Sequence, residues 1–254
     1  MKERIYMIPV NDAYRSSALC PLCELRNAVE NSSLEYYLGP SLMEPDVRIS
    51  TNTKGFCGDH LQKMYGREIN RLGMGLMLHT HLVDLAEDMN PCIASAAPSS
   101  GTLFRGRDRD YKKNLEAAAD RIEARAESCI ICDKIADTME RYLDVLLWMY
   151  FEDPSFRELF RTKKTHCLGH TAFLLRGAAK YLNQNQAAEF VSALASDSAQ
   201  GLAELTGDIE WFTQKFDYRN KDKPWGGAKS AIPRAISFLS ERGGPTDEAI
   251  TNGT

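Results

Sequence analysis

Cysteine and histidine occur in this chain twice in the same four-residue pattern, and this pattern restricts the fold more than any other feature. The first copy opens with Cys20-Pro21-Leu22-Cys23 and closes, 33 residues later, with Cys57-Gly58-Asp59-His60. The second opens with Cys129-Ile130-Ile131-Cys132 and closes, after 34 residues, with Cys167-Leu168-Gly169-His170. Three thiolates and one imidazole are a ligand set for a tetrahedral zinc ion. The sequence therefore predicts two zinc ions, one held within each copy.

The similarity between the copies extends beyond these motifs. A shift of 109 positions aligns the two CxxC pairs and also aligns Glu44-Pro45 with Asp153-Pro154. A shift of 110 aligns Lys54 with Lys164 and the two CxxH pairs. An internal repeat of this kind implies two structurally similar units. Six of the seven cysteines belong to the repeat, so chance clustering is a poor explanation.

The residue spacing suits a closed metal site at the starts of helices. A CxxH pair in the first turn of a helix places both ligands on one face. Four protein ligands leave no open position, which is typical of structural rather than catalytic zinc. Lys54 and Lys164 precede the closing cysteines by three residues and would screen the thiolate charge. An iron–sulfur cluster, a dithiol redox pair and unligated buried cysteines are the alternatives for the same residues.

Apolar residues recur at spacings of three and four, and no segment shows the alternation of a strand, so the predicted fold class is all-α. Two tandem zinc-pinned helical units and a C-terminal helical extension are expected. A helix over 21–38 is followed by a loop over 40–56 and a long helix from Cys57 to about Met89, where Asn90-Pro91 stops it. The predicted domains are a first unit (1–90), a linker (91–110), a second unit (111–185) and C-terminal helices with an aromatic-basic segment (186–254).

The bulk properties exclude some classes of protein. A net charge of −4 argues against a chain that mainly holds nucleic acid. The N-terminal residues lack the apolar region of a signal peptide, and no apolar run is long enough to span a membrane. We therefore expect a cytoplasmic protein, in a reducing compartment where CxxC pairs more often bind metals than form structural disulfides.

A second candidate site is an aromatic and basic run near the C-terminus. Between Trp211 and Arg234, six basic residues stand against two acidic ones. Such a surface would stack on a ring or hold an anionic group. The alternative is a packing role, in which the aromatics dock the last helix and the charges stay in water. The candidate ligand-binding residues are Trp211, Lys215, Tyr218, Arg219, Lys223 and Trp225.

These features together resemble an uncharacterised bacterial family with duplicated CxxC and CxxH motifs. The resemblance rests on the four motifs, on Glu35 to Pro40, on Glu44 to Arg48 and on the run from Trp211 to Trp225. Some members carry an automatic label of ABC-transporter substrate-binding protein. The sequence departs from that label: we expect no signal peptide and no lipid-anchor cysteine from its first residues, and it shows no alternating βα pattern. The family supplies no established activity.

The expected function is binding or scaffolding, with a protein or a small anionic ligand as the partner. The alternative is an enzyme or a redox or metal sensor, in which the thiolates react and metal release signals oxidation.

Overall fold

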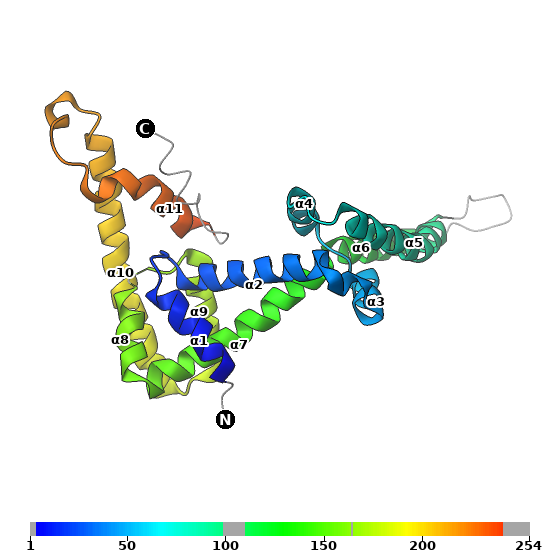
Figure 1. Ribbon diagram of the computed structural model, residues 1–254, viewed down its shortest axis with the longest axis horizontal. Coiled ribbons are helices and arrows are strands. Elements are labelled where there is room, and N and C mark those ends of the chain that lie inside the picture. Colours follow the sequence, from blue (N-terminus) through cyan, green and yellow to red (C-terminus); the bar gives the residue numbers. More distant parts are fainter. Residues whose placement is uncertain (1–3, 99–109, 164, 241–254) are drawn as a thin grey trace. The chain divides into compact units, whose positions relative to one another are not determined.

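The computed structural model describes residues 4–98, 110–163 and 165–240, which fold as helices and contain no strand (Figure 1). This confirms the all-α prediction. None of the described helices is both long enough and apolar enough to cross a membrane. The α-helices are α1 (Met7–Arg15), α2 (Pro21–Leu38), α3 (Pro45–Lys54), α4 (Gly58–Gly66), α5 (Arg71–Ala96), α6 (Tyr111–Glu127), α7 (Ile130–Glu152), α8 (Pro154–Thr162), α9 (Leu168–Tyr181), α10 (Gln184–Gln214) and α11 (Ala231–Leu239). Short 3₁₀ helices are η1 (Arg4–Tyr6), η2 (Pro40–Met43), η3 (Tyr218–Asn220) and η4 (Gly226–Ser230).

The helices form two compact units that do not follow the two sequence copies. Unit 1 comprises the described residues of 1–28 and 137–254, and unit 2 comprises those of 29–136. Helices α2 and α7 each contribute their first residues to one unit and their remaining residues to the other.

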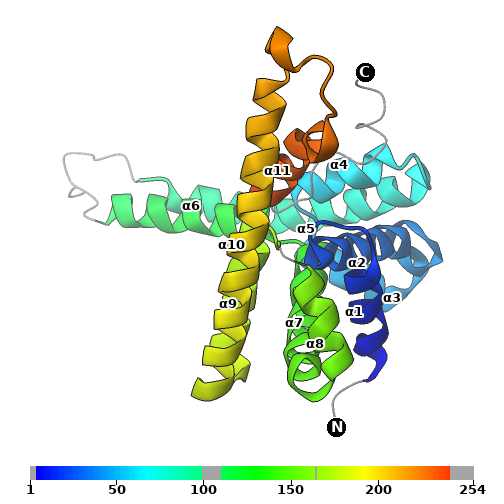
Figure 2. The same cartoon turned by 90° about the vertical axis from the view of Figure 1, so that its left-hand side faces the viewer.

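Unit 1 has an aromatic core. Tyr14 of α1 stacks on Phe160 of α8, with ring centroids 5.4 Å apart. Tyr150 of α7 contacts the edges of both Phe160 and Phe190. These four side chains come from four different helices, so the rings join α1, α7, α8 and α10 into one packed body. The long α10 runs beside α9 and also contacts α11 (Figure 2).

Unit 2 is built around α5, which contacts α3, α4 and α6. Arg48 of α3 donates to Thr80 of α5 at 2.9 Å. Gly55 ends α3 at φ 66°, where a side chain would be strained, and a Cβ there would lie 2.6 Å from the His81 ring of α5. Gly55 therefore permits both the turn into α4 and the close approach of α5.

Three of the predicted helix boundaries are wrong. The expected loop over 40–56 contains α3, which begins at Pro45, a residue suited to the first helical position, and ends at Lys54, directly before Gly55. The expected long helix from Cys57 is divided into α4 and α5, because Glu68 and Asn70 adopt positive φ values of 54° and 52°. Asn70 then caps α5 by accepting from the Gly73 amide.

The third wrong boundary is the stop at Asn90-Pro91, since α5 continues through Pro91 to Ala96. A proline removes one helix hydrogen bond, and here the following turn is retained with Ala96 buried. Of the predicted linker, residues 99–109 lie outside the described part of the chain.

Candidate metal sites

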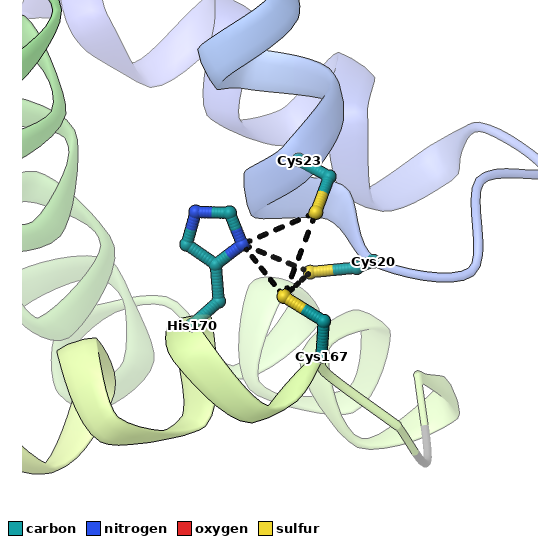
Figure 3. Close-up of side chains that lie close together, drawn as sticks. All are labelled: Cys20, Cys23, Cys167 and His170. Carbon is teal, nitrogen blue, oxygen red and sulfur yellow. Dashed lines mark hydrogen bonds between the residues drawn. The ribbon is translucent and has the colours of Figure 1, made fainter. Parts of the chain in front are cut away.

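The first Cys/His cluster, site A, consists of Cys20, Cys23, Cys167 and His170, all buried and all within unit 1. Cys20 and Cys23 come from the start of α2, and Cys167 and His170 come from the start of α9 (Figure 3). Their side chains point toward a common centre, and the four ligand atoms lie within 4.8 Å of one another.

The distances in site A fit a tetrahedral ion. Zinc–sulfur bonds of about 2.3 Å and zinc–nitrogen bonds of about 2.0 Å place two sulfurs about 3.8 Å apart, and a sulfur and a nitrogen about 3.5 Å apart. The Cys167 sulfur lies 3.9 Å from that of Cys20 and 3.6 Å from that of Cys23. His170 Nδ1 lies 3.1–3.4 Å from all three sulfurs. The donors therefore fit one closed Cys3His site.

Local backbone structure positions each half of site A. The Cys23 amide donates to the Cys20 carbonyl at 3.0 Å, which forms the turn that brings the two sulfurs to one side. Cys167 is the N-cap of α9, and the Thr171 amide donates to its carbonyl. Both pairs thus stand at helix N-termini, where the helix dipole favours thiolates.

Hydrogen bonds within site A shift the pKa values of its ligands. Hydrogen bonds from Cys20 and Cys23 hold the pKa of the Cys167 thiol far below its usual range. The hydrogen bond to Cys167 raises the pKa of Cys23. Burial, the largest effect, lowers the pKa of His170, but hydrogen bonds to Cys167 and Cys20 raise it overall to about 9. A metal ion must therefore displace protons from Cys23 and His170.

The second cluster, site B, consists of Cys57, His60, Cys129 and Cys132, all within unit 2. Cys57 is the N-cap of α4, and Cys129 directly precedes α7. His60 Nδ1 lies 3.2–3.5 Å from the three sulfurs, and the Cys57 and Cys132 sulfurs are 3.8 Å apart. Site B therefore fits the same tetrahedral ion.

In site B, a carboxylate forms a hydrogen bond with the ring nitrogen of the histidine that faces away from the sulfurs. His60 Nε2 lies 3.1 Å from Glu30 Oε1, and Lys63 donates to the other oxygen at 2.6 Å. This hydrogen bond fixes the ring so that Nδ1 faces the sulfurs. A backbone bond also supports the site, because the Ile130 amide donates to the Gly55 carbonyl at 3.1 Å.

The two sites differ in exposure. All four residues of site A are buried, whereas in site B Cys132 is exposed and Cys57 is partly exposed. Partial burial and the neighbouring Cys129 raise the pKa of the Cys132 thiol to about 12. Cys132 is therefore the ligand that a reagent in water reaches most readily.

The predicted grouping of the ligands is wrong, although all eight residues fall into two Cys3His clusters. We expected Cys20 and Cys23 to join Cys57 and His60, and Cys129 and Cys132 to join Cys167 and His170. Each CxxC pair instead meets the CxxH pair of the other copy. The reason is helix length: α2 has 18 residues and α7 has 23, or about 27 and 35 Å at 1.5 Å per residue. Each CxxC pair and the CxxH pair of its own copy therefore belong to different units.

Of the two lysines expected to screen the thiolates, Lys54 lies beside site B. Lys54 pairs with Asp133 in the first turn of α7 at 2.8 Å, so its ammonium is held by a carboxylate beside site B. Lys164 lies outside the described residues.

The candidate ligand-binding residues near the C-terminus form one folded loop. Lys215 is buried, and its ammonium donates to the carbonyls of Asn220, Lys221 and Lys223 at 2.6–2.9 Å. The Trp211 indole donates to the Pro224 carbonyl at 3.0 Å. These two side chains therefore stabilise the loop itself.

The remaining residues of this loop reach the surface. Arg219 pairs with Asp217 at 2.6 Å. Tyr218 is 86% exposed, and its neighbour Phe216 is 74% exposed. Lys223 lies over the Trp211 ring, and Trp225 packs against Phe212.

Sequence reasoning missed Glu30, which supports His60 from a helix that carries none of the ligands of site B. It lies four residues before Leu34 in a plain helical pattern, and no signal in the sequence links it to His60. It also missed an apolar cavity beside α5, which is described below.

A model described as "Family of unknown function (DUF6062)" matches residues 1–246 of this chain. The expected resemblance to an uncharacterised family is thereby confirmed. No curated protein and no solved structure shows a significant similarity to the chain.

Proposed function

The chain belongs to this family of unknown function, and we propose that it is a cytoplasmic binding or scaffold protein. Two structural zinc ions would stabilise its fold. The single observation that carries the proposal is the geometry of the eight donors, which form two closed Cys3His sets. Thiolate and imidazole ligands suit zinc, and four protein ligands complete its tetrahedral shell.

Each zinc ion would fasten segments that lie far apart in the sequence. In site A, the ion joins the start of α2 to the start of α9, and in site B it joins the start of α4 to the start of α7. The Cys20 and Cys167 sulfurs, for example, are separated by 147 residues of chain. Closing so long a loop has an entropic cost that zinc binding offsets, so metal and fold are coupled.

Elemental analysis of anaerobically purified protein tests this proposal. We expect two zinc ions per chain and an X-ray absorption spectrum with three sulfurs and one nitrogen around each. We also expect a chelator to lower the melting temperature. Iron with visible charge-transfer absorption would favour a cluster instead, and a fully folded protein that binds no metal would contradict the proposal.

We place the partner-binding surface on the C-terminal loop, where Tyr218 and Phe216 are exposed beside basic side chains. A protein segment or a small anionic ligand would stack on these rings and pair with the basic groups. Tyr218→Ala with Arg219→Ala should abolish partner capture and leave the protein folded, because both side chains are exposed. Unchanged capture of an identified partner by this variant would move the surface elsewhere. Lys215→Ala is unsuited to this test, because it removes three hydrogen bonds of the loop.

A second function, redox or metal sensing, is favoured at site B alone. The exposed Cys132 and partly exposed Cys57 have sulfurs 3.8 Å apart. Oxidation of these two thiolates to a disulfide by peroxide, which is reduced to water, would remove two of the four ligands and release the ion. Site A lacks such an exposed ligand.

A further inference from the structure

Unit 2 contains an apolar cavity of about 290 Å³ bordered by α4, α5 and α6. Four methionines and four leucines contribute to its lining, together with the rings of Phe56 and His81. His81 donates from Nδ1 to the Asn52 carbonyl at 2.8 Å, which holds the ring in place. The cavity lies apart from the C-terminal loop, which belongs to unit 1.

The cavity opens to solvent, because Leu82 and Ile122 of its lining are 58% and 37% exposed. An enclosed apolar cavity of about 150 Å³ is already large enough to bind benzene. About 300 Å³ is the lower end of the size range of ligand pockets. The lining also suits a ligand, because methionine side chains are flexible and adapt to an apolar guest.

One charged side chain, Arg125 of α6, lines the cavity. Its Nη1 donates to the Thr53 carbonyl, while its buried Nε has no hydrogen-bond partner. The Asp88 carboxylate lies 4.0 Å from that Nε and also pairs with Arg121. Two guanidinium groups therefore share one carboxylate, and a positive charge is left over beside the cavity. The Arg125 side chain is 24% exposed, so an anionic oxygen in the cavity would pair with its guanidinium.

We propose that this cavity binds a small apolar molecule with a single carboxylate head, of the class of medium-chain fatty acids. The apolar chain occupies the methionine- and leucine-lined space, and the carboxylate pairs with Arg125. A nucleotide or sugar does not fit this lining, since its polar groups would be buried without partners. The proposal stands whichever metal sites A and B hold.

Calorimetric titration of the full-length, metal-loaded protein with decanoate, below its micelle concentration, tests the proposal. We expect one decanoate per chain. Arg125→Met should weaken decanoate binding by tenfold or more, while the affinity for 1-decanol should be unchanged. Ala126→Phe adds a ring at a position that lines the cavity and should abolish binding of both molecules. Ala119→Phe, on an exposed position of the same helix, is the matched control and should bind decanoate as the natural chain does.

Circular dichroism and metal content show that each variant is folded. If Ala126→Phe does not fold, Ile122→Trp serves as the second filling variant, because Ile122 also lines the cavity and is 37% exposed. No saturable decanoate binding, or binding that survives a folded filling variant, would overturn the cavity assignment. Equal decanoate affinity in the natural chain and in Arg125→Met would overturn the carboxylate assignment.

Discussion

His60 Nε2 lies 3.1 Å from the Glu30 carboxylate, and this hydrogen bond leaves Nδ1 to face the three sulfurs of site B. Outer carboxylates of this kind contribute about 10- to 100-fold to metal affinity. Glu30→Ala should therefore weaken zinc binding at site B by that factor, as measured by competition with a chromophoric chelator. Site A should be unaffected.

Glu35→Ala is the matched control for that change. Glu35 is an exposed residue of the same helix that pairs with Arg67 at 3.6 Å. It should leave both zinc affinities unchanged. Equal affinities for Glu30→Ala and Glu35→Ala would show that the carboxylate does not support the ligand.

The difference in exposure between the sites predicts two phases of metal release under oxidation. Mild peroxide should release one zinc ion quickly, from site B, and the second much more slowly. Mass spectrometry after brief labelling should find Cys132 modified before Cys20 or Cys167, because reactivity follows access as well as thiolate character. Release of both ions at one rate would contradict this account.

Zinc affinity at site A should rise with pH. The raised pKa values of Cys23 and His170, about 9 for His170, mean that both groups carry protons in the metal-free site at neutral pH. Zinc binding releases the protons of its ligands, so the affinity should increase by at least about 100-fold per pH unit between about pH 6 and pH 8. Acid therefore removes zinc and its stabilisation. The affinity would be measured by competition in a chain that lacks the ligands of site B. A pH-independent affinity would contradict the claim that ligands of metal-free site A carry protons.

Gly55→Ala should destabilise unit 2 without touching a metal ligand. The residue has φ 66°, and an added Cβ would meet the His81 ring at 2.6 Å. Both effects oppose the substitution, with an expected cost of about 1–3 kcal/mol in the free energy of unfolding. Urea unfolding followed by circular dichroism measures it.

Gly75→Ala is the control for Gly55→Ala. Gly75 lies inside α5, and a Cβ there would meet nothing within 4 Å. Alanine should therefore be neutral or slightly stabilising, since it favours helix more than glycine does. A Gly55→Ala protein as stable as Gly75→Ala would mean that the α3–α5 approach tolerates a side chain.

The local structure of this chain was largely predictable from the sequence. Period-three and period-four spacing identified the all-α class and helix α2, and the CxxC and CxxH motifs identified all eight members of the Cys/His clusters. These signals are local. Each motif spans one turn of helix, so its two ligands face the same side independently of tertiary contacts.

The pairing of the motifs was not predictable in the same way. Two copies of one motif pattern offer two ways to combine a CxxC pair with a CxxH pair, and the motifs themselves do not distinguish them. Helices α2 and α7 each run from one unit into the other, so a CxxC pair and the CxxH pair of its own copy lie in different units. Glu30 was missed for a related reason, since its contact with His60 spans 30 residues.

Zinc stoichiometry in a chain without site B tests the central claim most directly. The variant carries alanine at Cys57, His60, Cys129 and Cys132, which removes two ligands from each sequence copy. All three tryptophans lie in residues 137–254, so their fluorescence reports whether unit 1 is still folded. Pairing across the copies predicts one zinc ion per chain, bound by three sulfurs and one nitrogen. A variant with unchanged tryptophan emission and no bound zinc would contradict that pairing.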